Sequence, residues 1–297
     1  MSTPERAIRR TTSRVAPSSD WPGCVAAGTV WLVALLVACV FFWIVGDLIR
    51  HALPHLTWSF LVEAPSDAGR SGGIGPILVS TMWLLGVCLT VSVPIGVGAA
   101  MYLAEFTRNG GRLGRFVRGS LDVLAGVPSI VFGLFGNALF SIYLGMGFSI
   151  LSGGLTLACM VLPILIRTTE EGLRAVPDDY RRAAVALGLS QTVTMWRVLL
   201  PAAAPGLIVG LVLGIGRAVG ETAALLFTSG YVDRMPESLL DSGRSLAVHI
   251  YDLAMNVPGG SGHAYATAFV LIGLLLVMNV LTFWIADRWL HRRVTPA

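Results

Sequence analysis

The stretch that decides the fold covers residues 123–166 and reads VLAGVPSIVFGLFGNALFSIYLGMGFSILSGGLTLACMVLPILI. It has 44 residues and no charged side chain. A helix needs about 20 apolar residues to cross the hydrocarbon core of a bilayer, so this stretch is too long for one crossing. Its middle, from Leu144-Gly145-Met146-Gly147 to Gly153-Gly154, carries the glycines that are typical of a tight turn. We therefore predict two membrane-spanning helices with a turn between them.

Four more uncharged stretches lie at residues 21–46, 71–104, 198–216 and 264–286. Each is long enough for one crossing, which gives about six transmembrane helices in an all-α integral membrane protein. The first stretch is too long for the 7–15-residue apolar region of a cleaved signal peptide, and a polar segment precedes it. We expect it to be a retained first span.

The composition excludes several classes of function. Charged residues make up 13% of the chain and the mean hydropathy is +0.74, whereas charged residues are about 25% of a typical soluble domain. All 21 basic residues are Arg, and a Walker A loop requires a Lys, so ATP chemistry must take place on another polypeptide. The four cysteines lie in apolar runs without metal-site spacing, and we expect no metal site.

The arginines predict the orientation, because short Arg-rich loops stay on the cytoplasmic side. Sixteen of the 21 fall in the N-terminal tail, the second and fourth loops and the C-terminal tail, against four on the other side. Both termini are therefore expected to be cytoplasmic. This topology signal accounts for the net charge of +4, so no nucleic-acid partner is expected.

The remaining arginine, Arg217, lies within the fifth predicted span, directly after the uncharged stretch 198–216 and four residues before Glu221. At that spacing the two side chains would share one helix face, and charges within a membrane usually face a cavity or each other. Gly206, Gly210 and Gly214 form a small-residue row on the same helix that predicts close packing against another helix. Besides a role in transport, an ion pair that fixes packing and a simple outer helix end both remain possible.

The fourth loop reads as helical, with Pro177 at a helix start, although a solvated linker would also fit. From Arg182 it reads Arg-Ala183-Ala184, three residues, Gly188, nine residues, then Val-Leu-Leu-Pro201. This pattern resembles the EAA signature of ABC importer permeases, except that Arg182 replaces the usual Glu. The resemblance implies a coupling helix that docks in a groove of an ATP-binding subunit, and Gly188 would end that helix.

Other segments extend the resemblance over residues 73–227. They read Ala-Met-Tyr-Leu-Ala-Glu-Phe at 100–106, Gly-Val-Pro-Ser-Ile-Val-Phe-Gly-Leu at 126–134, Arg-Thr-Thr-Glu at 167–170 and Gly-Glu-Thr-Ala at 220–223. Together they resemble the PstA-type permease family of phosphate-specific ABC importers, which have MetI-like architecture. The resemblance implies that Arg217, Glu221, Arg167 and Glu170 line or gate the phosphate path. Taken alone, Arg167 would also fit a positive-inside anchor.

The resemblance also implies the assembly. We expect a second permease of the PstC type, two copies of a PstB-type ATP-binding subunit, and an external phosphate-binding protein of the PstS type, in the bacterial inner membrane. ATP and Mg²⁺ would sit on the partner, and this chain would bind no cofactor. The predicted layout is a basic cytoplasmic tail (1–20), a first span with its outer loop (21–70), a permease core (71–286) with a coupling loop (about 167–197), and a C-terminal tail (287–297).

Three other functions remain open from the residues. A permease of the same architecture could carry sulfate or molybdate, and a self-contained channel would conduct without nucleotide. A membrane-embedded enzyme is disfavoured because the five histidines fall outside the predicted spans and form no HExxH motif.

Overall fold

A computed structural model describes residues 21–107 and 111–294 of the chain. The predicted tail at residues 1–20, Arg108 and the last three residues lie outside the described residues. In the described part the regular elements are all helices except for a short antiparallel ribbon, β1 (Pro65–Ser66) with β2 (Ser71–Gly72). The all-α prediction is confirmed. The first helix, α1 (Trp21–Ala52), belongs mainly to a separate unit that ends at Asp47.

The predicted number of spans agrees with the helices that the structure describes. Within residues 21–107 and 111–294, four helices are long and apolar enough to cross a membrane: α1, α3 (Gly75–Glu105), α6 (Ile150–Ala175) and α13 (Ser261–Val294). Two further candidates are bent pairs, and counting each pair as one span gives six. The first pair is α4 (Arg112–Ala125) with α5 (Ser129–Gly136) and its π-helical continuation η3 (Asn137–Tyr143). The second pair joins α8 (Gln191–Thr194), η4 (Met195–Leu199) and α9 (Leu200–Ala202) to α10 (Ala204–Val219).

The turn that divides the long uncharged stretch falls where the sequence predicts it. Gly145 and Gly147 both have positive φ, +69° and +62°, which a glycine adopts without steric cost. Ser149 then caps α6 by accepting a hydrogen bond from the backbone N–H of Ser152. Gly153 and Gly154 lie inside α6 instead of the turn, where a Cβ would meet side chains of other segments.

The third span differs from the prediction. Residues 112–118 were expected to be loop, but they begin α4, and the pair bends by 102° between Ala125 and Ser129. Pro128 stands before the first residue of α5 and cannot continue the preceding helix. The uncharged stretch begins only at residue 123, so the sequence did not indicate that this span includes the arginine-bearing turns of α4.

The fourth loop is also shorter than predicted, since α6 continues to Ala175 and takes in residues 167–175. After it come α7 (Asp178–Ala186) and the helices of the second bent pair, which turns by 67° at Ala203. Pro201 and Pro205 flank that bend, and a proline removes a helical N–H donor.

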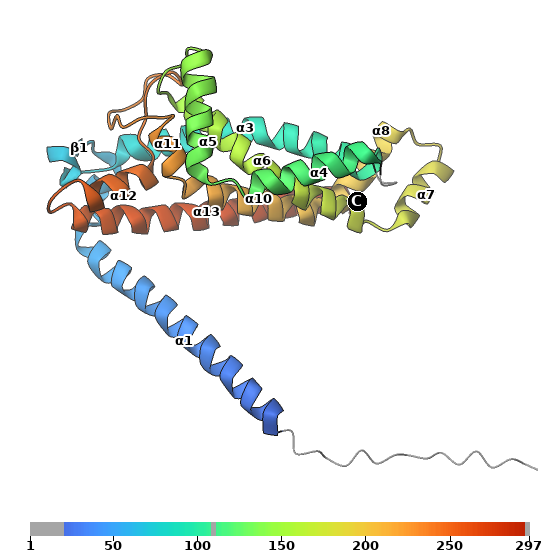
Figure 1. Ribbon diagram of the computed structural model, residues 1–297, viewed down its shortest axis with the longest axis horizontal. Helices are drawn as coiled ribbons and strands as arrows, with labels where there is room; N and C mark the ends of the chain where they lie inside the picture. The colour runs from blue at the N-terminus through green and yellow to red at the C-terminus, as the bar shows by residue number, and fades with distance from the viewer. Residues whose placement is uncertain (1–20, 108–110, 295–297) are drawn as a thin grey trace, which may run out of the picture. The chain divides into compact units, whose positions relative to one another are not determined.

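The core forms around α6, which packs against α3 on one side and α10 on the other, with α13 beside α10 (Figure 1). Its largest apolar cluster joins side chains such as Leu85 of α3, Leu157 and Val161 of α6, and Ile215 of α10. The helix α5 leaves this layer and runs across its direction (Figure 1). The remaining short helices are η1 (Leu53–His55), α2 (Trp58–Val62), η2 (Asp67–Gly69), α11 (Ala223–Leu226) and α12 (Leu246–Met255).

Candidate translocation and coupling sites

Arg217 lies in the last turn of α10 and Glu221 lies just beyond its end, so the two side chains do not share one helix face. The expectation of an i, i+4 pair is wrong because α10 ends at Val219, before Glu221. Glu221 is buried, and its Oε1 accepts a hydrogen bond of 3.1 Å from the backbone N–H of Ala224, which caps α11. Arg217 is exposed and, among the residues that the structure describes, has no hydrogen-bond or ion-pair partner. The carboxylate of Glu221 is thus held in place, while the guanidinium of Arg217 is available to a ligand or to a partner subunit.

The small-residue row of α10 faces α6 of the same chain. A Cβ on Gly206 would lie 2.7 Å from the Cα of Gly172, and one on Gly214 would lie 2.7 Å from Cγ1 of Val161. A Cβ on Gly210 would meet the hydroxyl of Thr168. These glycines let two helices approach closely, so the row serves packing within the subunit.

Arg167 and Glu170 each form an ion pair with a residue of α4 and not with each other. Nη2 of Arg167 lies 3.1 Å from Oδ1 of Asp122, and both side chains are partly exposed. Glu170 is 2% exposed, and its Oε1 lies 2.7 Å from Nε of Arg118 and 2.9 Å from Nε of Arg174. The sequence reasoning missed both partners. Arg174 follows Glu170 at i+4 and could have been found, but Arg118 is 52 residues away and left no local signal.

The predicted coupling segment forms the helix α7. It ends in a Schellman motif: the N–H of Gly188 donates to the carbonyl of Val185, and the N–H of Leu189 donates to that of Ala184. Gly188 has a φ of +69°, which explains the glycine. Ala184 is buried against the core.

The other face of α7 is open. Ala183 is exposed, and Val185 and Leu187 are each 76% exposed. Arg182 is also exposed and only loosely paired with Asp179, at 3.7 Å. These exposed apolar side chains, together with Arg182, form the surface that this helix offers to a partner.

A residue that the sequence analysis did not single out, Arg181, fixes the other side of α7. Its Nη2 and Nε lie 2.7 and 2.9 Å from Oε1 of Glu105, the last residue of α3. The two side chains are 15% and 13% exposed. No local pattern joins residues 76 positions apart, so the sequence gave no indication of this pair.

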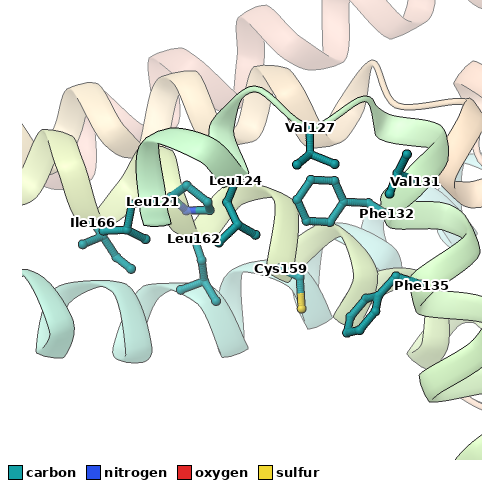
Figure 2. A pocket seen from close by; sticks show the side chains of 10 residues that line it. Leu121, Leu124, Val127, Val131, Phe132, Phe135, Cys159, Leu162 and Ile166 are labelled. Carbon is teal, nitrogen blue, oxygen red and sulfur yellow. The ribbon is translucent and has the colours of Figure 1, made fainter. Parts of the chain in front are cut away.

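An apolar groove of about 470 Å³ opens between α4, α5 and α6 (Figure 2). Its lining comprises Leu121, Leu124, Val127, Val131, Phe132, Phe135, Cys159, Leu162, Pro163 and Ile166. Such a lining offers no donor to an anion, and burying a charge there without a partner is costly. The groove therefore fits an apolar neighbour, not an oxyanion.

A second charged cluster lies in the segment between α10 and α13, which the sequence treated as loop. Arg244 lies 3.1 Å from Asp252 and 3.2 Å from Nδ1 of His249, and its Nε donates to the carbonyl of Tyr231. His249 was expected in a loop but is buried in α12. Burial, with Arg244 as the second cause, lowers the pKa of His249 to about 4, so this histidine stays neutral and accepts from the guanidinium.

Solved structures identify the class of fold. One chain of a bacterial ABC transporter involved in the import of the acidic polysaccharide alginate matches with a TM-score of 0.59 over 87% of this chain and 96% of that one, at 13% identity. A chain of the MetNI methionine ABC transporter, in an inward-facing conformation, matches with a TM-score of 0.52 over 75% and 95%, at 17% identity. At such identities the likeness concerns the fold alone, and the fold is that of ABC importer permeases.

Sequence comparison then gives the family. Residues 92–296 match the binding-protein-dependent transport system inner membrane component family, and the chain belongs to it. A probable ABC transporter permease protein, YqgI of Bacillus subtilis, is 32% identical over 90% of this chain and 94% of that protein. The phosphate transport system permease protein PstA 2 of Mycobacterium bovis is 33% identical over 99% of this chain and 94% of that protein. PstA of Haemophilus influenzae is 32% identical over 81% and 85%.

Proposed function

We propose that this chain is one of two permease subunits of an ATP-driven importer for inorganic phosphate in the bacterial inner membrane. The observation that carries the proposal is the extent of its likeness to permeases named for phosphate transport, which at 33% identity reaches 99% of this chain. The arrangement of charges supports it. An anion path needs a cation that is not already neutralised, and Arg217 offers one at the end of α10.

The chemistry of phosphate suits Arg217 and Glu221. Near neutral pH phosphate carries one to two negative charges and keeps at least one proton, so it can accept from a guanidinium and donate to a carboxylate. In the proposal Arg217 lowers the barrier to the anion, and Glu221 keeps the site from binding phosphate too tightly to release it. Arg167, which holds only the partly exposed Asp122, would act near the cytoplasmic end of the path. Glu170 is buried, so it would act there through Arg118 and Arg174.

The proposed partners follow from the exposed surfaces and the family. The open face of α7, with Ala183 and Arg182, would dock on one of two copies of a PstB-type ATP-binding subunit, and Gly188 and Pro201 would fix the ends of that segment. A PstC-type permease would complete the path, and a PstS-type binding protein would deliver phosphate from outside. Both termini would be cytoplasmic. This chain would be non-catalytic and bind no cofactor, since ATP and Mg²⁺ would be bound by the partner.

The test is the ATPase rate of the complete complex in proteoliposomes. We expect stimulation by the binding protein loaded with phosphate, together with uptake of labelled phosphate, and no stimulation by its sulfate- or molybdate-loaded counterparts. Stimulation by sulfate or molybdate alone would contradict the phosphate assignment and leave the permease architecture intact.

A further inference from the structure

Two arginines close the ends of the central helices at one end of the molecule. The first is Arg181 of α7. Besides its two bonds to Glu105, it donates from Nη2 to the carbonyl of Leu173 at 3.0 Å and from Nη1 to that of Val176 at 2.9 Å. The last carbonyls of a helix have no intrahelical donor. Pro177, which follows α6, has no N–H to offer, so the guanidinium of Arg181 closes α6 instead.

The second arginine, Arg118 of α4, closes α3 in the same way. Its Nη2 donates to the carbonyl of Leu103 at 3.0 Å and to Oγ1 of Thr107 at 2.9 Å, while its Nε reaches Glu170 of α6. The last turn of α3 is therefore held from three directions: by α4 through Arg118, by α6 through the same arginine and Glu170, and by α7 through Arg181. We call Arg118, Glu170, Arg174, Glu105 and Arg181 the arginine clasp.

Most of the clasp is more buried than a surface ion pair. Arg118, Glu105 and Arg181 are each 13–17% exposed and Glu170 is 2% exposed, although Arg174 is 38% exposed. By contrast, Arg182 and Asp179 of α7 are 79% and 86% exposed. Removing one member of a buried pair leaves an uncompensated charge and is strongly destabilising, while a surface pair contributes little. Movement of α7 without movement of α3 would break the Arg181–Glu105 contact, so the two elements are expected to move together.

One unpaired atom of the clasp would permit a second arrangement. Arg118 and Arg174 both use Oε1 of Glu170, and Oε2 of the same carboxylate is buried without a hydrogen-bond partner. A buried acceptor left unpaired carries a free-energy cost, which a small rotation of Glu170 would relieve by giving each arginine its own oxygen. Two discrete pairings within one packed cluster are what the transmission of a conformational change requires.

We propose that Arg181 is a positioning residue that passes the movement of the coupling helix α7 to α3, and through Arg118 and Glu170 to the bent pair of α4 and α5. The proposal rests on the proposed function, because it assigns α7 to the contact with the ATP-binding subunit. It concerns different residues, since neither Arg181 nor Glu105 is assigned to the phosphate path.

Glu105→Gln in the complete complex tests the inference. Arg181 would keep Asp178 at 3.4 Å and the carbonyls of Leu173 and Val176, so we expect normal assembly and a normal basal ATPase rate. We also expect loss of stimulation by the loaded binding protein and a fall of about tenfold in phosphate uptake, within the usual range of coupling free energies. Glu171→Gln is the matched control, because it removes an exposed carboxylate from the same end of α6, and it should behave as the wild type. Wild-type stimulation and uptake in Glu105→Gln would overturn the proposal, as would basal and stimulated rates that fall in the same proportion.

A double variant separates coupling from folding. Without Glu105, Arg181 keeps only the half-exposed Asp178, at 3.4 Å, as its counter-ion. If Glu105→Gln assembles poorly for that reason, adding Arg181→Gln removes the buried charge and should restore assembly. Stimulation should remain absent in the double variant, and its return would overturn the proposal. Should phosphate fail to stimulate even the wild type, the proposed substrate is wrong, and the same comparison is made with whichever loaded binding protein does stimulate.

Discussion

At the scale of single residues, Arg217 carries the sharpest prediction. Arg217→Ala should lower phosphate uptake by about tenfold or more, since a hydrogen bond to a charged group contributes about 1.5–3 kcal/mol. Arg217→Lys keeps the charge but lacks the planar guanidinium, so its phosphate uptake should lie between that of the wild type and that of Arg217→Ala. Uptake of labelled phosphate, in cells with no other uptake system and at equal membrane levels of the subunit, provides the measurement.

Arg234→Ala is the matched control for this experiment. Arg234 is another exposed arginine, in the segment between α11 and α12, and its loss should leave uptake unchanged. Wild-type uptake in Arg217→Ala would remove this residue from the path.

The residue scale also shows what a sequence can and cannot reveal about the site. Arg217 and Glu221 stood out because charges are rare in apolar stretches. Their pairing was mispredicted because the helix was extended past Val219, although Gly220, its C-cap residue, is a helix-end signal in the sequence. Arg118 and Glu170 could not be joined at all, because ion pairs between distant helices leave no periodic trace. The partners of a charge therefore had to come from the structure.

At the scale of elements, the packing of α10 on α6 predicts a contrast between two glycines. Gly206→Ala should lower the melting temperature of the detergent-solubilised complex, because its Cβ would press on the backbone at Gly172, which cannot move aside. Gly216→Ala is the control on the same helix: a Cβ there meets nothing within 4 Å, so this variant should keep or slightly raise the melting temperature. An equal fall in melting temperature in both variants would show that the close approach of α10 to α6 at Gly206 does not determine the stability.

Elements whose boundaries depend on backbone chemistry were predicted well, and bends were not. The turn at Gly145 and Gly147 and the helix end at Gly188 require a positive φ, and a glycine in the sequence indicates such a position. The 102° bend before α5 lies beside contacts between distant segments, such as that of α11 with α5, and contacts of this kind leave no periodic trace in the sequence. The apolar side chains of α12 gave no indication that they would surround a buried histidine.

At the scale of the whole molecule, composition predicts that ATP chemistry takes place on another polypeptide, since this chain contains no lysine for a Walker A loop. The chain forms a single permease subunit. Its Arg217 is exposed at the end of α10, and an apolar groove opens between α4, α5 and α6. Both features suit a chain that lines one side of a path and needs a neighbour to complete it. Conduction should therefore depend on the assembly.

Liposomes that contain this chain alone should show no phosphate flux above that of protein-free liposomes. An anion would have to cross hydrocarbon beside a single guanidinium, and one compensating charge does not replace its hydration. The complete complex, with ATP on the side of the ATP-binding subunits and phosphate-loaded binding protein on the other, serves as the positive control and should accumulate labelled phosphate. The same complex without ATP should not. Nucleotide-independent flux through the chain alone would make it a channel, and the dependence on partners inferred from its arginines and its coupling helix would then be wrong.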